Sequence, residues 1–320
     1  MIAGLGRILT CREGHERQQL IVGLSGVEVV EIGACPAATT AEARLASGEV
    51  AVHRVALGVG GADLASLEAV LSRDERERAG RFRFGRHRDR FIVARSALRR
   101  ILSVYGAGAP AEIRLRYGPK GKPRLASDCG IEFNVSHSED LAVVAVAQGS
   151  EVGIDVERIR AMPSGRAIAR RFFSATEAAM LERLPAAEFG EAFWRCWTRK
   201  EAYVKARGDG LSLPLDSFDV SLEAPGRLLL LATRPDAGEA HHWRLLDVNV
   251  GPGYAAALAV GGPVDRLRCV GFPGPPHGGP PCASRRPSAQ APRSARTGAS
   301  SSSSRRTGVV SAGCLPLTRA

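Results

Sequence analysis

The segment EVGIDVERI, residues 151–159, alternates apolar and polar side chains as a half-buried β-strand does. The aliphatic side chains at its even-numbered positions would point to one face, and the carboxylates of Asp155 and Glu157 to the other. Neighbouring carboxylates repel each other unless a cation or a protein charge lies beside them. Hard oxygen ligands of this kind suit Mg²⁺. The alternative is a pair of solvent-facing acids on an edge strand.

A long helix is predicted downstream, at AEFGEAFWRCWTRKEAYVKARG, residues 187–208. Glu201 and Lys205 are four residues apart, so they share one face of this helix. The simplest interpretation is a surface ion pair worth less than about 1 kcal/mol. The helix also carries five aromatic side chains: Phe189, Phe193, Trp194, Trp197 and Tyr203. This density favours a well-packed helix, in which Glu201 would be partly sheltered and would need a partner.

Lysine is rare in this chain. Of its 44 Lys and Arg residues, only four are lysines: Lys120, Lys122, Lys200 and Lys205. An ammonium group on a flexible stem can reach a phosphate in a confined site where a planar guanidinium does not fit. The four lysines therefore indicate a phosphate path, with codon bias as the alternative. Lys200 lies about 100° around the helix from Glu201, so we expect it to be solvated.

Hydroxyl and imidazole groups cluster at the end of another predicted strand, in FNVSHSED, residues 133–140. Ser136, His137 and Ser138, together with backbone N–H groups, could hold a phosphate. Turn chemistry from Asn134 and the two serines is the alternative interpretation.

The composition is that of a globular protein, with 44% hydrophobic and 24% charged residues in a chain of 320. No apolar run approaches the roughly 18 residues of a membrane span, and the N-terminus lacks the apolar core of a secretory signal. A cytoplasmic location is therefore expected. The seven cysteines are widely spaced and include no CxxC pair, which argues against a disulfide framework and against a structural zinc site.

The formal net charge is +11, but it is concentrated near the C-terminus. The last fifty residues contain seven Arg and no acid, so subtracting these seven charges leaves +4 for residues 1–270. This mild excess suits an acidic partner and does not by itself indicate a nucleic acid.

Helical and strand patterns mix without strict alternation, which predicts an α+β fold. Strands are expected at VAVHRVALGV, EIRLRYG and LAVVAVA, and in four later segments, SFDVSL, RLLLLAT, HHWRLLDVNV and YAAALAV. Helices are expected at DLASLEAV and DRFIVARSALRRILSVYG, and DERERAGRF is interpreted as a charged turn. Ser174, with Glu177 three positions later, predicts a capping box.

Four segments are expected along the chain. Residues 1–48 form a poorly patterned extension, 49–150 an N-terminal α+β half, 151–265 a C-terminal α+β half with the metal and catalytic residues, and 266–320 a disordered tail. The tail is rich in Pro, Gly, Ser and Arg and has almost no large apolar side chain. It cannot bury enough surface to offset the entropy lost on ordering.

Six motifs resemble one family, the Sfp-type 4′-phosphopantetheinyl transferases. They are GKPRL (121–125), FNVSHS (133–138), GIDVE (153–157), RRFFSATE (170–177), WTRKEAYVK (197–205) and GLSLPLDSF (210–218). They occur in the family's order and at compatible separations. The resemblance implies a pseudo-dimer of two similar α+β halves within one monomeric chain, with coenzyme A in the cleft between them.

The resemblance also implies an activity. Members of this family move the phosphopantetheine arm of coenzyme A to a serine of an apo acyl or peptidyl carrier protein, and release 3′,5′-ADP. By position, the Mg²⁺ ligands are Asp155, Glu157 and Glu201. Lys205 matches the lysine near the pyrophosphate, and Glu201 is also the best candidate for the base that takes the serine proton. Neither a membrane nor a nucleic acid is an expected partner.

The coenzyme A contacts implied by the resemblance are Lys122, Ser136 and His137. Arg78 falls where the family often has a basic residue for the 3′-phosphate, on a looser alignment. Lys120 departs from the pattern, because some members have an aromatic residue there, near the adenine.

Two other functions remain as alternatives. One is a different Mg²⁺-dependent phosphoryl-transfer or nucleotidyl-transfer enzyme that uses the same acids. The other is a basic nucleic-acid-binding module, supported by the net charge and by the interleaved Arg and Phe of RFRFGRHRDRF, residues 81–91.

Overall fold

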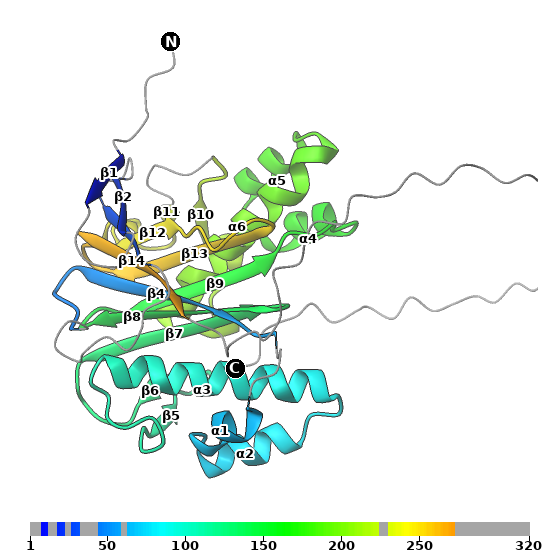
Figure 1. The fold of residues 1–320 in the computed structure, drawn as a ribbon. Helices are drawn as coiled ribbons and strands as arrows, with labels where there is room; N and C mark the ends of the chain where they lie inside the picture. Colours follow the sequence, from blue (N-terminus) through cyan, green and yellow to red (C-terminus); the bar gives the residue numbers. More distant parts are fainter. Residues whose placement is uncertain are drawn as a thin grey trace, which may run out of the picture.

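The computed structural model describes residues 8–11, 18–22, 27–32, 44–58, 63–223 and 230–272. Two sheets pack face to face, and each is covered on its outer side by helices (Figure 1). This gives four layers in the order helices, sheet, sheet, helices. The expected α+β fold with two halves is confirmed.

The larger sheet has seven strands in the order β1-β2-β3-β14-β4-β8-β7. Its strands are β1 (Ile8–Cys11), β2 (Gln18–Val22), β3 (Glu28–Ile32), β4 (Glu49–Ala56), β7 (Ile131–Ser138), β8 (Leu141–Gln148) and β14 (Arg266–Phe272). The outer helices are α1 (Leu64–Ala69), α2 (Arg73–Gly80) and α3 (Gly85–Val104). A short hairpin, β5 (Leu115–Tyr117) and β6 (Pro123–Leu125), precedes β7.

The smaller sheet has the order β12-β13-β9. Its strands are β9 (Val152–Arg158), β12 (Trp243–Asp247) and β13 (Tyr254–Gly261). The helices of this half are α4 (Gly165–Phe172), α5 (Ala175–Glu182), α6 (Ala186–Arg207) and α7 (Glu239–His242). Two 3₁₀ turns, η1 (Gly210–Ser212) and η2 (Leu215–Ser217), lead into the pair β10 (Phe218–Val220) and β11 (Leu230–Thr233).

The alternation predicted for residues 151–159 is confirmed in β9. Val152, Ile154 and Val156 are fully buried in the core between the two sheets, against aliphatic side chains of β4 and β8. Each such side chain contributes about 1.5–3 kcal/mol by leaving water. The opposite face of β9 turns toward α6, which packs on β9 and β13. Because the aliphatic side chains of β9 face the core between the sheets, Asp155 and Glu157 face the side of the strand on which α6 packs.

Gly153 sets how closely α6 approaches β9. A Cβ at this position would lie 2.2 Å from the carbonyl oxygen of Ala202 and 2.2 Å from the amide nitrogen of Ala206. No side chain fits there unless the backbone moves. The helix can therefore lie directly on the strand, two residues from Asp155.

Three expectations about the course of the chain differ from the structure. The segment interpreted as a charged turn contains most of α2, which begins at a capping box between Ser72 and Glu75. The boundary of the tail at residue 266 is also too early, because 266–272 form β14, which lies between β3 and β4 as a parallel strand. Strands β1–β3 belong to the stretch treated as a poorly patterned extension. Residues 273–320 lie outside the described part of the chain.

Candidate active site

Asp155 and Glu157 lie on β9 where it contacts β7 and α6. They are 2% and 5% exposed, so the alternative of a solvent-facing pair of acids is wrong. Strand β7 supplies a hydroxyl to each carboxylate. The Ser136 hydroxyl donates to Asp155 Oδ1 at 2.8 Å, and the Ser138 hydroxyl donates to Glu157 Oε2 at 2.7 Å.

Lys205 reaches the same group from α6. Its Nζ lies 2.6 Å from Asp155 Oδ1 and 3.0 Å from the Ser136 hydroxyl. An ion pair between Glu201 and Lys205 is not found among the described residues, so the interpretation of a local surface pair on the helix is wrong. Spacing on α6 puts both residues beside β9, and Lys205 pairs with the strand.

Asp155 is close enough to Glu157 and to Glu201 to raise the pKa of each. Burial, and then the charge of Asp155, raise the pKa of Glu157 to about 7. Burial, and then the charge of Asp155, likewise raise the pKa of Glu201 to about 7. Asp155 Oδ2 is buried and has no hydrogen-bond partner. The site therefore has more negative charge than Lys205 alone compensates.

This arrangement fits a divalent cation by its chemistry. Three carboxylates and one unpartnered buried oxygen are the donor set that Mg²⁺ prefers. The fit is not a closed coordination shell: the described residues contain no group of three His, Cys, Asp or Glu side chains already arranged around one metal position. The carboxylates would have to turn toward a bound ion.

Lys122 lies at the joint between the two halves. Its Nζ donates to the carbonyl oxygens of Val152 and Ala206, each at 3.0 Å. Burial, with a smaller effect of Arg124, lowers the pKa of Lys122 to about 8. This lysine therefore connects the start of β9 to the end of α6.

His137 and Arg78 lie on the N-terminal half. His137 follows Ser136 on β7 and keeps an exposed surface. Partial loss of water around the imidazole, and then the positive charges of Lys205 and Arg95, lower the pKa of His137. The guanidinium of Arg78 lies 5.3 Å from the centre of the Phe91 ring, and Arg95 lies 5.6 Å from the same ring. His137 is thus near a group of cations, and Arg78 belongs to an Arg–Phe–Arg stack.

Lys200 was expected to be solvated, and this is wrong. Its side chain is completely buried, and Nζ lies 2.8 Å from Glu177 Oε2, 2.7 Å from the Leu215 carbonyl and 2.8 Å from the Phe218 carbonyl. The capping box of α5 is confirmed, and its Glu177 is the acid that Lys200 pairs with. The sequence identified the cap, but not the second partner of its glutamate.

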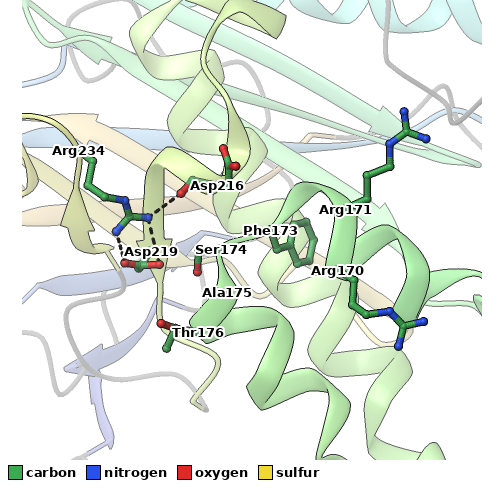
Figure 2. Close-up of a pocket in the computed structure, with 9 residues that line it drawn as sticks. All are labelled: Arg170, Arg171, Phe173, Ser174, Ala175, Thr176, Asp216, Asp219 and Arg234. Carbon is green, nitrogen blue, oxygen red and sulfur yellow. Dashed lines mark hydrogen bonds and ion pairs between the residues drawn. The ribbon is translucent and has the colours of Figure 1, made fainter.

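A separate pocket of about 470 Å³ lies where α4 meets α5, against η2 and β10 (Figure 2). Arg170 and Arg171 lie on one side of it, and Arg234, paired with Asp219 at 2.6 Å, lies on the other. No predicted site residue lines this pocket.

None of the helices in the described ranges is both long enough and apolar enough to cross a bilayer.

Comparison with known proteins identifies the class. Residues 151–259 match the 4′-phosphopantetheinyl transferase superfamily, and residues 61–149 match the 4′-phosphopantetheinyl transferase N-terminal domain. The 4′-phosphopantetheinyl transferase HetI of Nostoc sp. is 38% identical over 221 residues, which are 68% of this chain and 90% of that protein. The chain therefore belongs to the 4′-phosphopantetheinyl transferase family, as the sequence motifs predicted.

Two further comparisons are more distant. The 4′-phosphopantetheinyl transferase Sfp of Bacillus subtilis is 31% identical over 193 residues, 60% of this chain and 83% of that protein. A crystal structure of the Thermotoga maritima holo-(acyl-carrier-protein) synthase covers 35% of this chain and 63% of that chain, at 24% identity and a TM-score of 0.29. The likeness to this structure is too small to support an argument.

Proposed function

We propose that this chain transfers the 4′-phosphopantetheine arm of coenzyme A to a serine of an apo acyl or peptidyl carrier protein in the cytoplasm. Membership of the transferase family supports the reaction. The observation that carries the proposal for the site is the contact between Lys205 and Asp155, 2.6 Å apart, beside the unpartnered Asp155 Oδ2. A buried oxygen without a partner is costly, so its presence beside two further acids favours a bound ion.

In this proposal Asp155, Glu157 and Glu201 hold Mg²⁺. The bound ion would offset the negative charge on the pyrophosphate of coenzyme A. Asp155 is oriented by Ser136 and Lys205, and Glu157 by Ser138. These hydrogen bonds fix one oxygen of each carboxylate before substrate arrives.

Glu201 is the candidate base. The carrier serine forms a bond from its oxygen to the β-phosphorus, the bond from that phosphorus to the leaving oxygen breaks, and the serine proton passes to a carboxylate oxygen of Glu201. The Glu201 carboxylate lies close enough to Asp155 to feel its charge, so it belongs to the group of acids where this proton would be accepted. Lys205 would then stabilise the charge on the departing 3′,5′-ADP, since its ammonium lies within the group of acids.

The residues predicted to contact coenzyme A differ in how free they are to bind a phosphate. His137, exposed and next to Ser136, is available to a phosphate, and Arg78 offers a guanidinium on the same half. The Lys122 ammonium donates to two carbonyls, which leaves one of its three hydrogens for a phosphate. We therefore expect a mainly structural role for Lys122. The two halves within one chain favour a monomer.

The test is mass spectrometry of several apo carrier proteins after incubation with coenzyme A, Mg²⁺ and the protein. We expect one carrier serine to gain a phosphopantetheine, and the gain to be lost with EDTA or with Asp155→Asn. A folded protein that hydrolyses or transfers other phosphates, but leaves every carrier unmodified, would favour a different phosphoryl-transfer enzyme.

A further inference from the structure

Strands β7 and β9 are joined by side chains instead of by a backbone ladder. Among the described strands, β7 pairs only with β8 and β9 only with β13, yet β7 and β9 contact each other along their length. Three backbone N–H groups of β9 donate to β7 side chains: Ile154 to Asn134 Oδ1 at 2.9 Å, Val156 to Ser136 Oγ at 3.3 Å, and Arg158 to Ser138 Oγ at 3.1 Å. The repeat advances two residues on each strand at every step.

The two serines of this repeat have a second contact that the asparagine lacks. Each hydroxyl accepts from a β9 amide and donates its only hydrogen to the preceding carboxylate, Ser136 to Asp155 and Ser138 to Glu157. A hydroxyl has one hydrogen to donate. Because each serine oxygen accepts from a β9 amide, that hydrogen is free to be donated to the carboxylate. At the equivalent step Asn134 lies opposite Gly153, which has no side chain.

Ser138 is the more informative of the two serines. Ser136 contacts both Asp155 and Lys205, whereas the side-chain partner of Ser138 is Glu157. Ser138 is 7% exposed and Glu157 is 5% exposed, so neither is freely hydrated. Its hydrogen bond occupies Glu157 Oε2 and fixes the plane of the carboxylate. Such hydrogen bonds orient a carboxylate that ligates a metal.

We propose that Ser138 is a positioning residue for the acidic site: it holds Glu157 oriented for a divalent cation, while Asn134, at the equivalent step, serves only to join the two sheets. This inference rests on the proposed function, because it assumes that the acids bind a metal. It adds a role for a residue that the motif comparison left unassigned.

The experiment compares Ser138→Ala with Asn134→Ala in the full chain without coenzyme A. Mn²⁺ binding is measured by the loss of the free-ion signal in electron paramagnetic resonance, and thermal unfolding in EDTA is measured in parallel. Both variants lose one amide acceptor, so both midpoints should fall. Only Ser138→Ala should weaken Mn²⁺ binding, by about tenfold, within the usual range for residues that orient a metal ligand. Asn134→Ala should stay within about twofold, because it orients no acid.

Conservative variants extend the comparison. Ser138→Thr keeps the hydroxyl and should restore Mn²⁺ affinity. Ser138→Cys keeps the volume with a weaker donor, so its affinity should be intermediate; it also replaces the alanine variant if that protein does not fold. Equal Mn²⁺ affinity in Ser138→Ala and Asn134→Ala would overturn the positioning role alone. Absence of Mn²⁺ binding by the unaltered protein would overturn the proposed metal site, and the positioning role with it.

Discussion

Lys200 and Lys205 lie five residues apart on α6, yet their surroundings are opposite. Lys200 makes three contacts with oxygen, and its partner Glu177 also accepts from the amides of Ser174 at 3.0 Å and Val220 at 2.7 Å. Lys205 is 17% exposed and contacts an aspartate whose other oxygen has no partner. We call Lys200, Glu177 and their oxygen and amide partners the closed network, and it holds α6 to α5 and β10. We call Lys205 and Asp155 the open network. The open network has an oxygen that can still accept a bond, which is what a site for an ion and a phosphate needs.

The largest expected effect breaks the closed network. Lys200→Met leaves the Glu177 carboxylate buried without its cation, so the free energy of unfolding should fall by about 3–5 kcal/mol. Urea denaturation at pH 7 measures this loss. The double variant Lys200→Met with Glu177→Leu should recover part of it, because no buried charge remains. A loss below about 1 kcal/mol in the single variant would contradict a buried structural pair.

Lys205→Ala tests the open network. Its carrier-modification rate should fall about 10²–10³-fold, as when one charge-stabilising group of an active site is removed. The loss of unfolding free energy should be smaller than for Lys200→Met, because water can reach the vacated position. Lys205→Arg should also lower the rate, since a planar fork needs different room. A near-normal rate in Lys205→Ala would remove its proposed role.

His53 sharpens the comparison by showing what burial alone does. Burial lowers the pKa of His53 to about 3, and its Nε2 lies 2.8 Å from the Tyr105 hydroxyl. Below the unfolded pKa the unfolded state binds a proton that the folded state does not, so stability falls as pH falls toward 3. Between pH 7 and pH 5 this group should contribute about 2 kcal/mol of that loss. His53→Phe should flatten the pH profile of urea denaturation, and Tyr105→Phe, which keeps the imidazole, should not.

The smallest expected effect is at the cap of α5. Ser174 accepts from the Glu177 amide at 3.3 Å. Ser174→Ala should lower the free energy of unfolding by about 1 kcal/mol. Ser174→Asn, another good cap, serves as the control. If Ser174→Ala instead lost as much unfolding free energy as the double variant Lys200→Met with Glu177→Leu, the cap would also hold the closed network together.

Much of the acidic site could be predicted from the sequence. The alternation in β9 predicted the common face of Asp155 and Glu157, and the spacing on α6 predicted that Glu201 and Lys205 share a face. These features are local, because strand and helix periods fix them. The order of the six motifs supplied the family, which no single spacing could have done.

The remaining features depend on contacts between distant segments. Nothing local distinguishes Lys200 from Lys205, since burial of Lys200 depends on carbonyls of Leu215 and Phe218. The double use of Ser138 requires β7 and β9 to lie side by side. The helix α2 was missed because its charged residues gave no apolar period, although Ser72 and Glu75 form its cap. A search for capping boxes across the whole chain would have found it.

The position of β14 has a consequence for the order in which the chain can mature. It lies inside the larger sheet, between β3 and β4, and Arg268 Nε binds Glu49 Oε1 at 2.5 Å across the junction. A ribosome therefore completes the entire smaller sheet before it makes the strand that connects β3 to β4. Until then the nascent N-terminal half has an unpaired edge at β4, and an unpaired strand edge is where wrong pairing can begin.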